Sequence, residues 1–215
     1  MDLSHVVEDG MVTYKGLPAP HICDWLSREA SRANYAPGTE FQIGQITMVA
    51  NTGTYIDTPF HRYAEGDDLS QVGLERLVEL PGVVVRTGDR RAIDADAFDG
   101  LDVAGKAVLV HTGWSRHWRT EAYYEGHPFL SEAAAERLVA GGARLVGVDS
   151  HNIDDTSGRT RPVHSTLLGA GVLIVEHMRG LDELPDGPFR FFAAPPKVKD
   201  FGTFPVRAFA AVDEG

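Results

Sequence analysis

Cysteine is almost absent from this chain of 215 residues, since Cys23 is the only one. A single cysteine cannot form an intramolecular disulfide or a CxxC metal or redox motif, so we expect a reducing, cytoplasmic setting. Positive charge is also scarce: 20 Lys and Arg face 31 Asp and Glu, for a formal net charge of −11. Because nucleic acids and anionic lipids attract proteins through positive charge, we expect neither as a partner.

Long hydrophobic runs and glycine-rich nucleotide motifs are missing as well. No run of about 18 apolar residues occurs, so no membrane span is expected. The N-terminal segment has neither a basic start nor an apolar stretch, and we expect no signal peptide. The 23 glycines form no G-x-G-x-x-G or Walker sequence, so a nucleotide cofactor is not expected. Hydrophobic residues, at 43%, nevertheless suffice for a packed core.

Short β-branched runs are the strongest regular pattern in the sequence and favour strands that are buried on both faces. Helical spacing occurs in Leu69–Leu80 and in Leu130–Ala140, the second with Ser131 as N-cap. The stretch Glu40–Asp57 predicts one long strand or a hairpin. We therefore expect an α/β fold, a single domain over residues 1–215 with a mixed β-sheet core and flanking helices. The expected strands are Val83–Val85, Ala107–Val110, Arg144–Val148, Val172–Val175, Phe189–Ala193 and Val206–Val212.

The densest group of polar side chains lies in Asn51–His61, N-T-G-T-Y-I-D-T-P-F-H. In an extended chain Asn51, Tyr55 and Asp57 share one parity and would face one cleft. Pro59 would end the strand and place His61 at its rim. A carboxylate and an imidazole four residues apart suit a metal site or a general acid/base pair, and a hydrogen-bonded turn is the alternative.

A second feature is the polar residue that ends several apolar runs. Glu176 follows G-V-L-I-V directly, and Asp149 and His111 end two earlier runs. In open α/β sheets, ligands bind outside the carboxyl ends of the strands. Glu176 is costly to bury unless it is paired, protonated or metal-bound, and exit into solvent is the alternative.

The segment Asn51–His61 resembles the motif H-x-G-T-H-x-D-x-P-x-H of the cyclase family that includes bacterial kynurenine formamidase and isatin hydrolase. The resemblance implies a layered β/β/α fold, an enzyme acting on a small-molecule substrate, and a homodimer or homotetramer. It covers nearly the whole chain, because other segments are similar in the same order. These are Asp2–His5, His111–Trp114, Gly147–Asp154, Val163–Leu168, Ile174–Glu176, Leu181–Leu184 and Pro205–Ala208.

The resemblance also implies roles for individual residues. Asp57, His164 and Glu176 match positions that bind a divalent metal, and His61 matches the residue that transfers protons. Asn51 and Tyr55, however, stand where the family has two histidines that bind another ion. An amide is a feeble ligand, and a phenol must lose a proton of pKa near 10 to become a good one, so we expect that this first metal site is lost.

These residues leave two chemistries open. In one, a single Zn or Mn ion on Asp57, His164 and Glu176 activates water to hydrolyse an amide or lactam, with His61 as the proton carrier. In the other, a metal-free cyclase, dehydratase or isomerase uses Asp57–His61 and Glu176–His164 as acid/base dyads. Tyr55 and Asn51 would then donate hydrogen bonds to a substrate carbonyl. An inactive small-molecule-binding relative is the third possibility.

Overall fold

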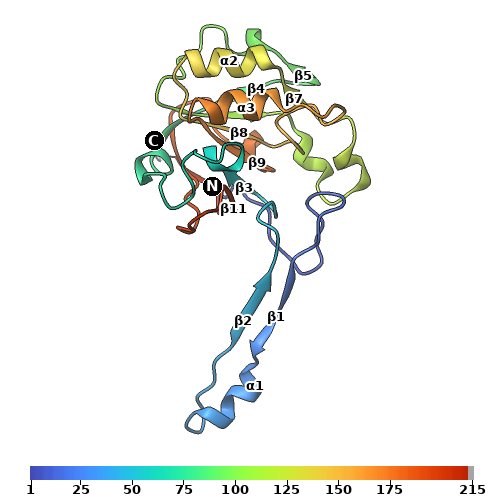
Figure 1. Cartoon of the computed structure of the whole chain (residues 1–215), viewed down its shortest axis with the longest axis vertical. Coiled ribbons are helices and arrows are strands. Elements are labelled where there is room, and N and C mark those ends of the chain that lie inside the picture. The colour runs from blue at the N-terminus through green and yellow to red at the C-terminus, as the bar shows by residue number, and fades with distance from the viewer. Residues whose placement is uncertain (213–215) are drawn as a thin grey trace.

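The computed structural model describes residues 1–212, and its centre is an eight-stranded mixed sheet (Figure 1). The four central strands are parallel, and the two strands at each edge run antiparallel to their neighbours. The expected mixed α/β fold is thereby confirmed. From edge to edge the strands are β11 (Thr203–Pro205), β3 (Tyr55–Asp57), β9 (Leu173–Glu176), β8 (Leu145–Val148), β6 (Ala107–His111), β4 (Leu80–Arg86), β10 (Phe189–Phe192) and β12 (Phe209–Ala211).

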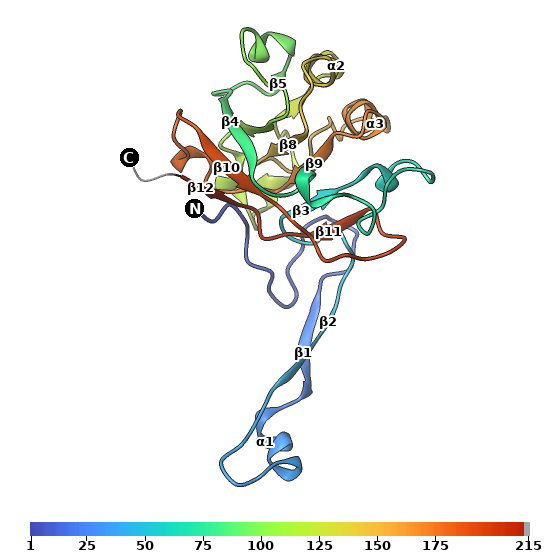
Figure 2. The same cartoon turned by 90° about the vertical axis from the view of Figure 1, so that its left-hand side faces the viewer.

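Alternate side chains of the central strands pack on opposite faces of the sheet, as strand geometry requires. Val108 and Val110 of β6 belong to the core beneath the helices α2 (Glu132–Ala140) and α3 (Pro162–Gly169). Leu109 belongs to the core on the other face, together with side chains of β10 and β12. The sheet is therefore covered by helices on one face and by its own curled edge on the other (Figure 2).

Most predicted elements are present, but the helix over Leu69–Leu80 is wrong. The carboxylate of Asp68 accepts hydrogen bonds from the backbone amides of Ser70 and Gln71, as a helix cap would, but only a turn follows. Gly73 is extended, with φ −69° and ψ 147°, and only the 3-10 turn Leu74–Arg76 forms after it. Leu77 is buried in the core as the apolar spacing indicated, whereas Leu74 is 65% exposed. In contrast, Ser131 caps α2 as predicted, because its hydroxyl accepts from the Ala134 amide.

The stretch Glu40–Asp57 forms neither one long strand nor a hairpin. Its first part is β2 (Ile43–Thr47), which pairs with β1 (His21–Leu26), and its last part is β3 in the main sheet. Gly53 separates the two with a φ of +66°, a conformation that glycine adopts without strain. The predicted shared parity therefore holds for Tyr55 and Asp57, whereas Asn51 lies before the strand.

Strands β1 and β2, with the short helix α1 (Arg28–Ser31), form an arm that projects from the body of the molecule (Figures 1 and 2). All of β2 is exposed, and large apolar side chains on the arm face solvent, among them Trp25 at 75% and Ile46 at 55%. A two-stranded ribbon is marginally stable in water by itself, and exposed apolar surface of this kind marks interaction sites. No helix among the described residues has the length and apolarity to cross a bilayer.

We expect a second copy of the chain to cover this arm, since symmetric dimers are the commonest assembly and the arm projects from the body with its apolar side chains exposed. The double variant Trp25→Ser, Ile46→Ser should then shift the protein from dimer to monomer in sedimentation velocity at micromolar concentration. Glu29→Ser, an exposed polar position on α1, is the control and should sediment like the wild type. A wild-type protein that is monomeric throughout would contradict the expectation.

Candidate active site

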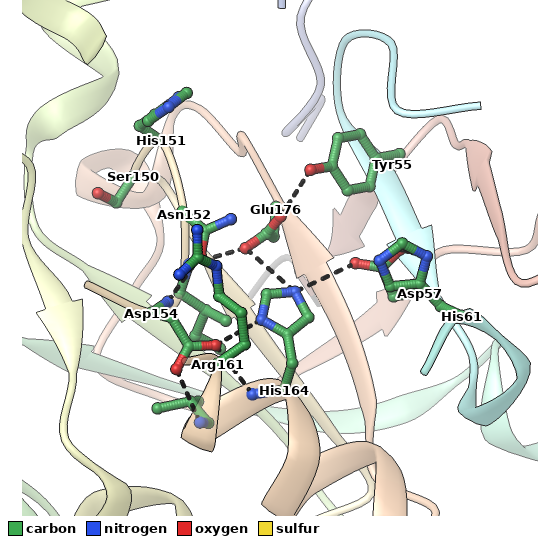
Figure 3. Close-up of polar contacts among 12 residues, drawn as sticks. Tyr55, Asp57, His61, Ser150, His151, Asn152, Asp154, Arg161, His164 and Glu176 are labelled. Atoms are coloured by element: carbon green, nitrogen blue, oxygen red, sulfur yellow. Dashed lines mark hydrogen bonds and ion pairs between the residues drawn. The ribbon is translucent and has the colours of Figure 1, made fainter. Parts of the chain in front are cut away.

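Pairing of β3 with β9 brings together two polar segments that are far apart in the sequence. Tyr55 lies opposite Glu176 in the antiparallel register, and the Tyr55 hydroxyl donates a 2.6 Å hydrogen bond to Glu176 Oε2. Asp57 ends β3, and the 3-10 turn Pro59–His61 follows it directly. Helix α3 supplies His164, which lies between the Asp57 and Glu176 carboxylates (Figure 3).

These residues surround a pocket of about 300 Å³. Asp57 is fully buried behind the pocket wall, and His61 lies at the rim with a side chain that is 35% exposed. All six residues singled out in the sequence therefore lie at one place in the fold. The lining side chains are Tyr14, Leu17, Asn51, Tyr55, His61, Arg62, Asn152, Arg161, His164 and Glu176.

The imidazole of His164 is fixed by a carboxylate that sequence reasoning gave no role. Its Nδ1 lies 2.6 Å from Asp154 Oδ2, and the same carboxylate accepts from the backbone amides of Val163 and His164. His164 Nε2 then faces Asp57 Oδ2 and Glu176 Oε1, each at 3.8 Å. Burial alone would lower the pKa of His164, but Asp154, Asp57 and Glu176 together raise it to about 10.

Donor atoms for a metal ion converge at this point. Ligand atoms of Asp57, His61 and His164 lie within 4.8 Å of one another. Asp57 Oδ2 is buried and has no hydrogen-bond partner among the described residues, so it is available to a ligand. Carboxylate and imidazole are the donors that zinc and manganese accept. This group of three differs from the predicted ligand set Asp57, His164 and Glu176. His61 takes the place of Glu176, whose Oε1 lies 3.8 Å from His164 Nε2.

The two predicted acid/base dyads are not direct contacts. Asp57 Oδ1 and His61 Nδ1 are 3.8 Å apart, and the Thr203 hydroxyl bridges them, donating to Asp57 and lying 2.8 Å from His61. Gly202 permits this bridge, because a Cβ there would lie 2.2 Å from the His61 amide nitrogen. His164 is likewise hydrogen-bonded to Asp154 instead of Glu176.

Tyr55 also differs from the prediction that its hydroxyl donates to a substrate carbonyl. A phenol has one hydrogen, and that hydrogen is directed at Glu176. Burial and the nearby Glu176 charge raise the pKa of Tyr55 well above 10, so the phenol stays protonated. Burial also raises the pKa of Glu176 to about 7, against the opposing effect of His164.

Sequence reasoning missed Thr203 and the role of Asp154. Asp154 could have been found, because it ends the segment Gly147–Asp154, which follows a buried strand and belongs to the family resemblance. Thr203 carries no such signal, since a lone threonine near the C-terminus becomes relevant only through the pairing of β11 with β3.

Four further imidazoles are packed next to the site and kept neutral by burial. The pKa of His151 falls to about 3 because of burial and then the nearby His127, and that of His5 to about 4 because of burial and then Arg179. The pKa values of His127 and His177 are lowered as well, again mainly by burial. His151 Nδ1 and His5 Nε2 are buried without a hydrogen-bond partner among the described residues.

We expect the protein to lose stability already below about pH 6.5, at a higher pH than protonation of carboxylates alone would cause. Below pH 6.5 the unfolded chain binds a proton at His151, whereas the folded chain does not bind it until about pH 3. The free energy of unfolding should therefore decrease as the pH is lowered from 6.5 toward 3. The slope is about 1.4 kcal/mol per pH unit for each such histidine. In urea titrations at pH 7 and pH 5, His151→Phe should reduce this dependence and His21→Phe, on the arm, should not. An unchanged dependence in His151→Phe would contradict the expectation.

Known proteins resemble this chain in sequence and in fold. The family model described as "Putative cyclase" matches residues 1–155. A kynurenine formamidase of Geobacillus thermodenitrificans is 31% identical over 180 residues, which are 83% of this chain and 84% of that protein. The structure described as a predicted metal-dependent hydrolase from Bacillus stearothermophilus has a TM-score of 0.76 at 29% identity and covers 97% of this chain and 95% of its own. Isatin hydrolase A from Labrenzia aggregata, solved with benzyl benzoate, shares the fold, with a TM-score of 0.82 at 22% identity over 100% of this chain and 93% of its own.

Proposed function

Because the chain belongs to the cyclase family, we propose that it is a cytoplasmic hydrolase of small amides or lactams that uses one divalent metal ion. The observation that carries this proposal is the convergence of His164 Nε2, on a side chain that lines the pocket, and Asp57 Oδ2, which lies 3.8 Å from it just behind the pocket wall and has no hydrogen-bond partner among the described residues. The similarity to a kynurenine formamidase and to a metal-dependent hydrolase supports it, since a formamide is an amide.

Zinc or manganese fits the donors that are present. Asp57, His164 and Glu176 would hold the ion, and Asp154 would orient His164 from behind, an arrangement typical of metal-binding histidines. When bound, the ion would polarise the substrate carbonyl and lower the pKa of a water molecule. Asn51 and Tyr55 offer no comparable donor on the other side, so a single ion is proposed.

Proton transfer is assigned to His61. The Thr203 hydroxyl donates to Asp57, so the contact between Thr203 and His61 requires a hydrogen on His61 Nδ1. Nε2 is then the nitrogen that can accept a proton from water and deliver it to the leaving nitrogen of the amide. Arg62, Arg161 and Asn51 line the pocket and are available to orient the substrate.

Removal of the Asp154 charge should weaken metal binding although the proposed ligands Asp57, His164 and Glu176 are all still present. We expect Asp154→Asn to lower zinc affinity about 10- to 100-fold in a chelator competition, because a neutral amide with one acceptor oxygen replaces the carboxylate that orients His164 and makes its ring a stronger ligand. Asp155→Asn, in the same loop, is the control and should bind zinc like the wild type. Thermal unfolding of both metal-free variants shows whether the helix start is intact. Equal zinc affinity of Asp154→Asn and wild type would contradict the assignment.

Loss of His61 should stop turnover without loss of the ion. We expect His61→Ala to lower kcat on isatin or N-formylkynurenine by about 10²- to 10⁴-fold with KM nearly unchanged, as for removal of a general base. Metal analysis of the same preparation should give wild-type content. If the variant loses its metal, His61 is a ligand and the assignment of proton transfer is wrong. If wild type and variant bind both compounds equally and turn over neither, the chain is an inactive binding relative.

One observation favours a metal-independent cyclase, dehydratase or isomerase as the second candidate. His164, with its pKa raised to about 10, is an imidazolium at neutral pH and supplies positive charge to the carboxylates around it without an ion. Activity that survives exhaustive chelation, in protein with no metal detected, would support this candidate and overturn the first.

A further inference from the structure

A line of buried hydrogen bonds continues from Glu176 away from the pocket. The Tyr55 hydroxyl lies 3.3 Å from His177 Nε2, and His177 Nδ1 lies 2.9 Å from the Tyr123 hydroxyl. His177 and Tyr123 are fully buried, and neither lines the pocket. We propose that His177 and Tyr123 are positioning residues that hold the Tyr55 hydroxyl on Glu176. This inference rests on the proposed function insofar as it concerns turnover.

The donor and acceptor of each hydrogen bond in this line follow from its last member, the Glu176 carboxylate, which can only accept. Tyr55 gives its one hydrogen to the Glu176 carboxylate, so it can only accept from His177. His177 Nε2 must therefore carry a hydrogen. In a neutral imidazole Nδ1 then lacks one, and the Tyr123 hydroxyl has to donate to it. The line runs in one direction, from Tyr123 through His177 and Tyr55 to Glu176.

The backbone conformation of His177 independently supports a functional role for this side chain. Its φ is +55°, in the left-handed region that only a few per cent of residues other than glycine adopt, with histidine, asparagine and aspartate the most frequent among them. The Thr54 hydroxyl donates a 2.6 Å bond to the His177 carbonyl, and the Met178 amide bonds to Val148 O. Such strained conformations persist where neighbouring contacts enforce them, and they cluster at functional sites. In this conformation the His177 imidazole lies 3.3 Å from the Tyr55 hydroxyl.

Aromatic rings enclose the His177 imidazole and limit its rotation. The ring centroids of Tyr14, Tyr55 and Trp118 lie 5.4, 5.1 and 5.6 Å from that of His177. These rings and the two hydrogen bonds, at Nε2 to Tyr55 and at Nδ1 to Tyr123, together hold the imidazole in the observed orientation. Tyr55 is then held on Glu176 Oε2, and Glu176 Oε1 remains directed at His164.

A double-mutant cycle between Tyr55→Phe and His177→Phe tests the inference. If His177 acts through the Tyr55 hydroxyl, the two changes should be non-additive by about tenfold in the unfolding equilibrium constant, measured in urea with chelator present. His177→Phe should also lower kcat about tenfold with little change in KM, and in Tyr55→Phe it should lower kcat no further. His177→Gln keeps a donor where Nε2 lies and an acceptor beside it, so it should restore most of the kcat.

A second cycle serves if His177→Phe does not fold. Tyr123→Phe removes one hydroxyl and should also be non-additive with Tyr55→Phe, whereas Tyr124→Phe, whose hydroxyl bonds to Val12 O, is the control and should be additive. Additivity in both cycles, or equal loss of kcat in His177→Gln and His177→Phe, would overturn the inference. A wild type that turns over neither probe compound refutes the proposed function instead, and the unfolding cycles still decide whether the line of hydrogen bonds is coupled.

Discussion

The candidate site depends on the burial of three carboxyl groups around one imidazole. Asp57, Asp154 and Glu176 are at most 1% exposed, and His164 lies among them. Burying carboxylates without compensation is very costly, so positive charge and hydrogen-bond donors must converge there. Backbone amides, the Thr203 hydroxyl and His164 supply part of this compensation. Among the described residues, however, Asp57 Oδ2 has no hydrogen-bond donor. A divalent ion would offset the remaining negative charge directly.

Rigid elements keep these groups in place. Asp57 and Glu176 belong to neighbouring strands inside the sheet, where backbone pairing fixes the direction of their side chains. Asp154 accepts from the first amides of α3, where a helix favours negative charge, and so joins the helix start to the His164 ring. The position of His164 is therefore set by the fold at the backbone and at Nδ1, and only Nε2 is left for chemistry.

How much of this could be predicted from the sequence depends on how local each contact is. Asp57 and His61 are four residues apart, so the motif alone indicated their proximity, and the strand ending in Glu176 followed from a buried run. Thr203 reaches both only because β11 pairs with β3 and Gly202 passes close to the His61 backbone, and such a register leaves no trace in a linear pattern. The helix expected over Leu69–Leu80 is interrupted at Gly73, whose backbone is extended, and the apolar spacing on either side of this glycine does not reveal the break.

The pocket has a Tyr55 side and a His164 side, and Tyr55 explains why only the His164 side is suited to hold a metal ion. An imidazole at this position would present a lone pair to an ion, whereas a buried phenol whose pKa is raised well above 10 stays protonated. Its hydrogen is directed at Glu176, and its oxygen faces His177 Nε2, so both of its capacities are used within the protein. The candidate metal-binding atoms among the described residues lie on the other side, where Asp57, His61 and His164 converge. Tyr55 therefore supports Glu176 by a hydrogen bond, and the single ion of the proposed function would lie on the His164 side of the pocket.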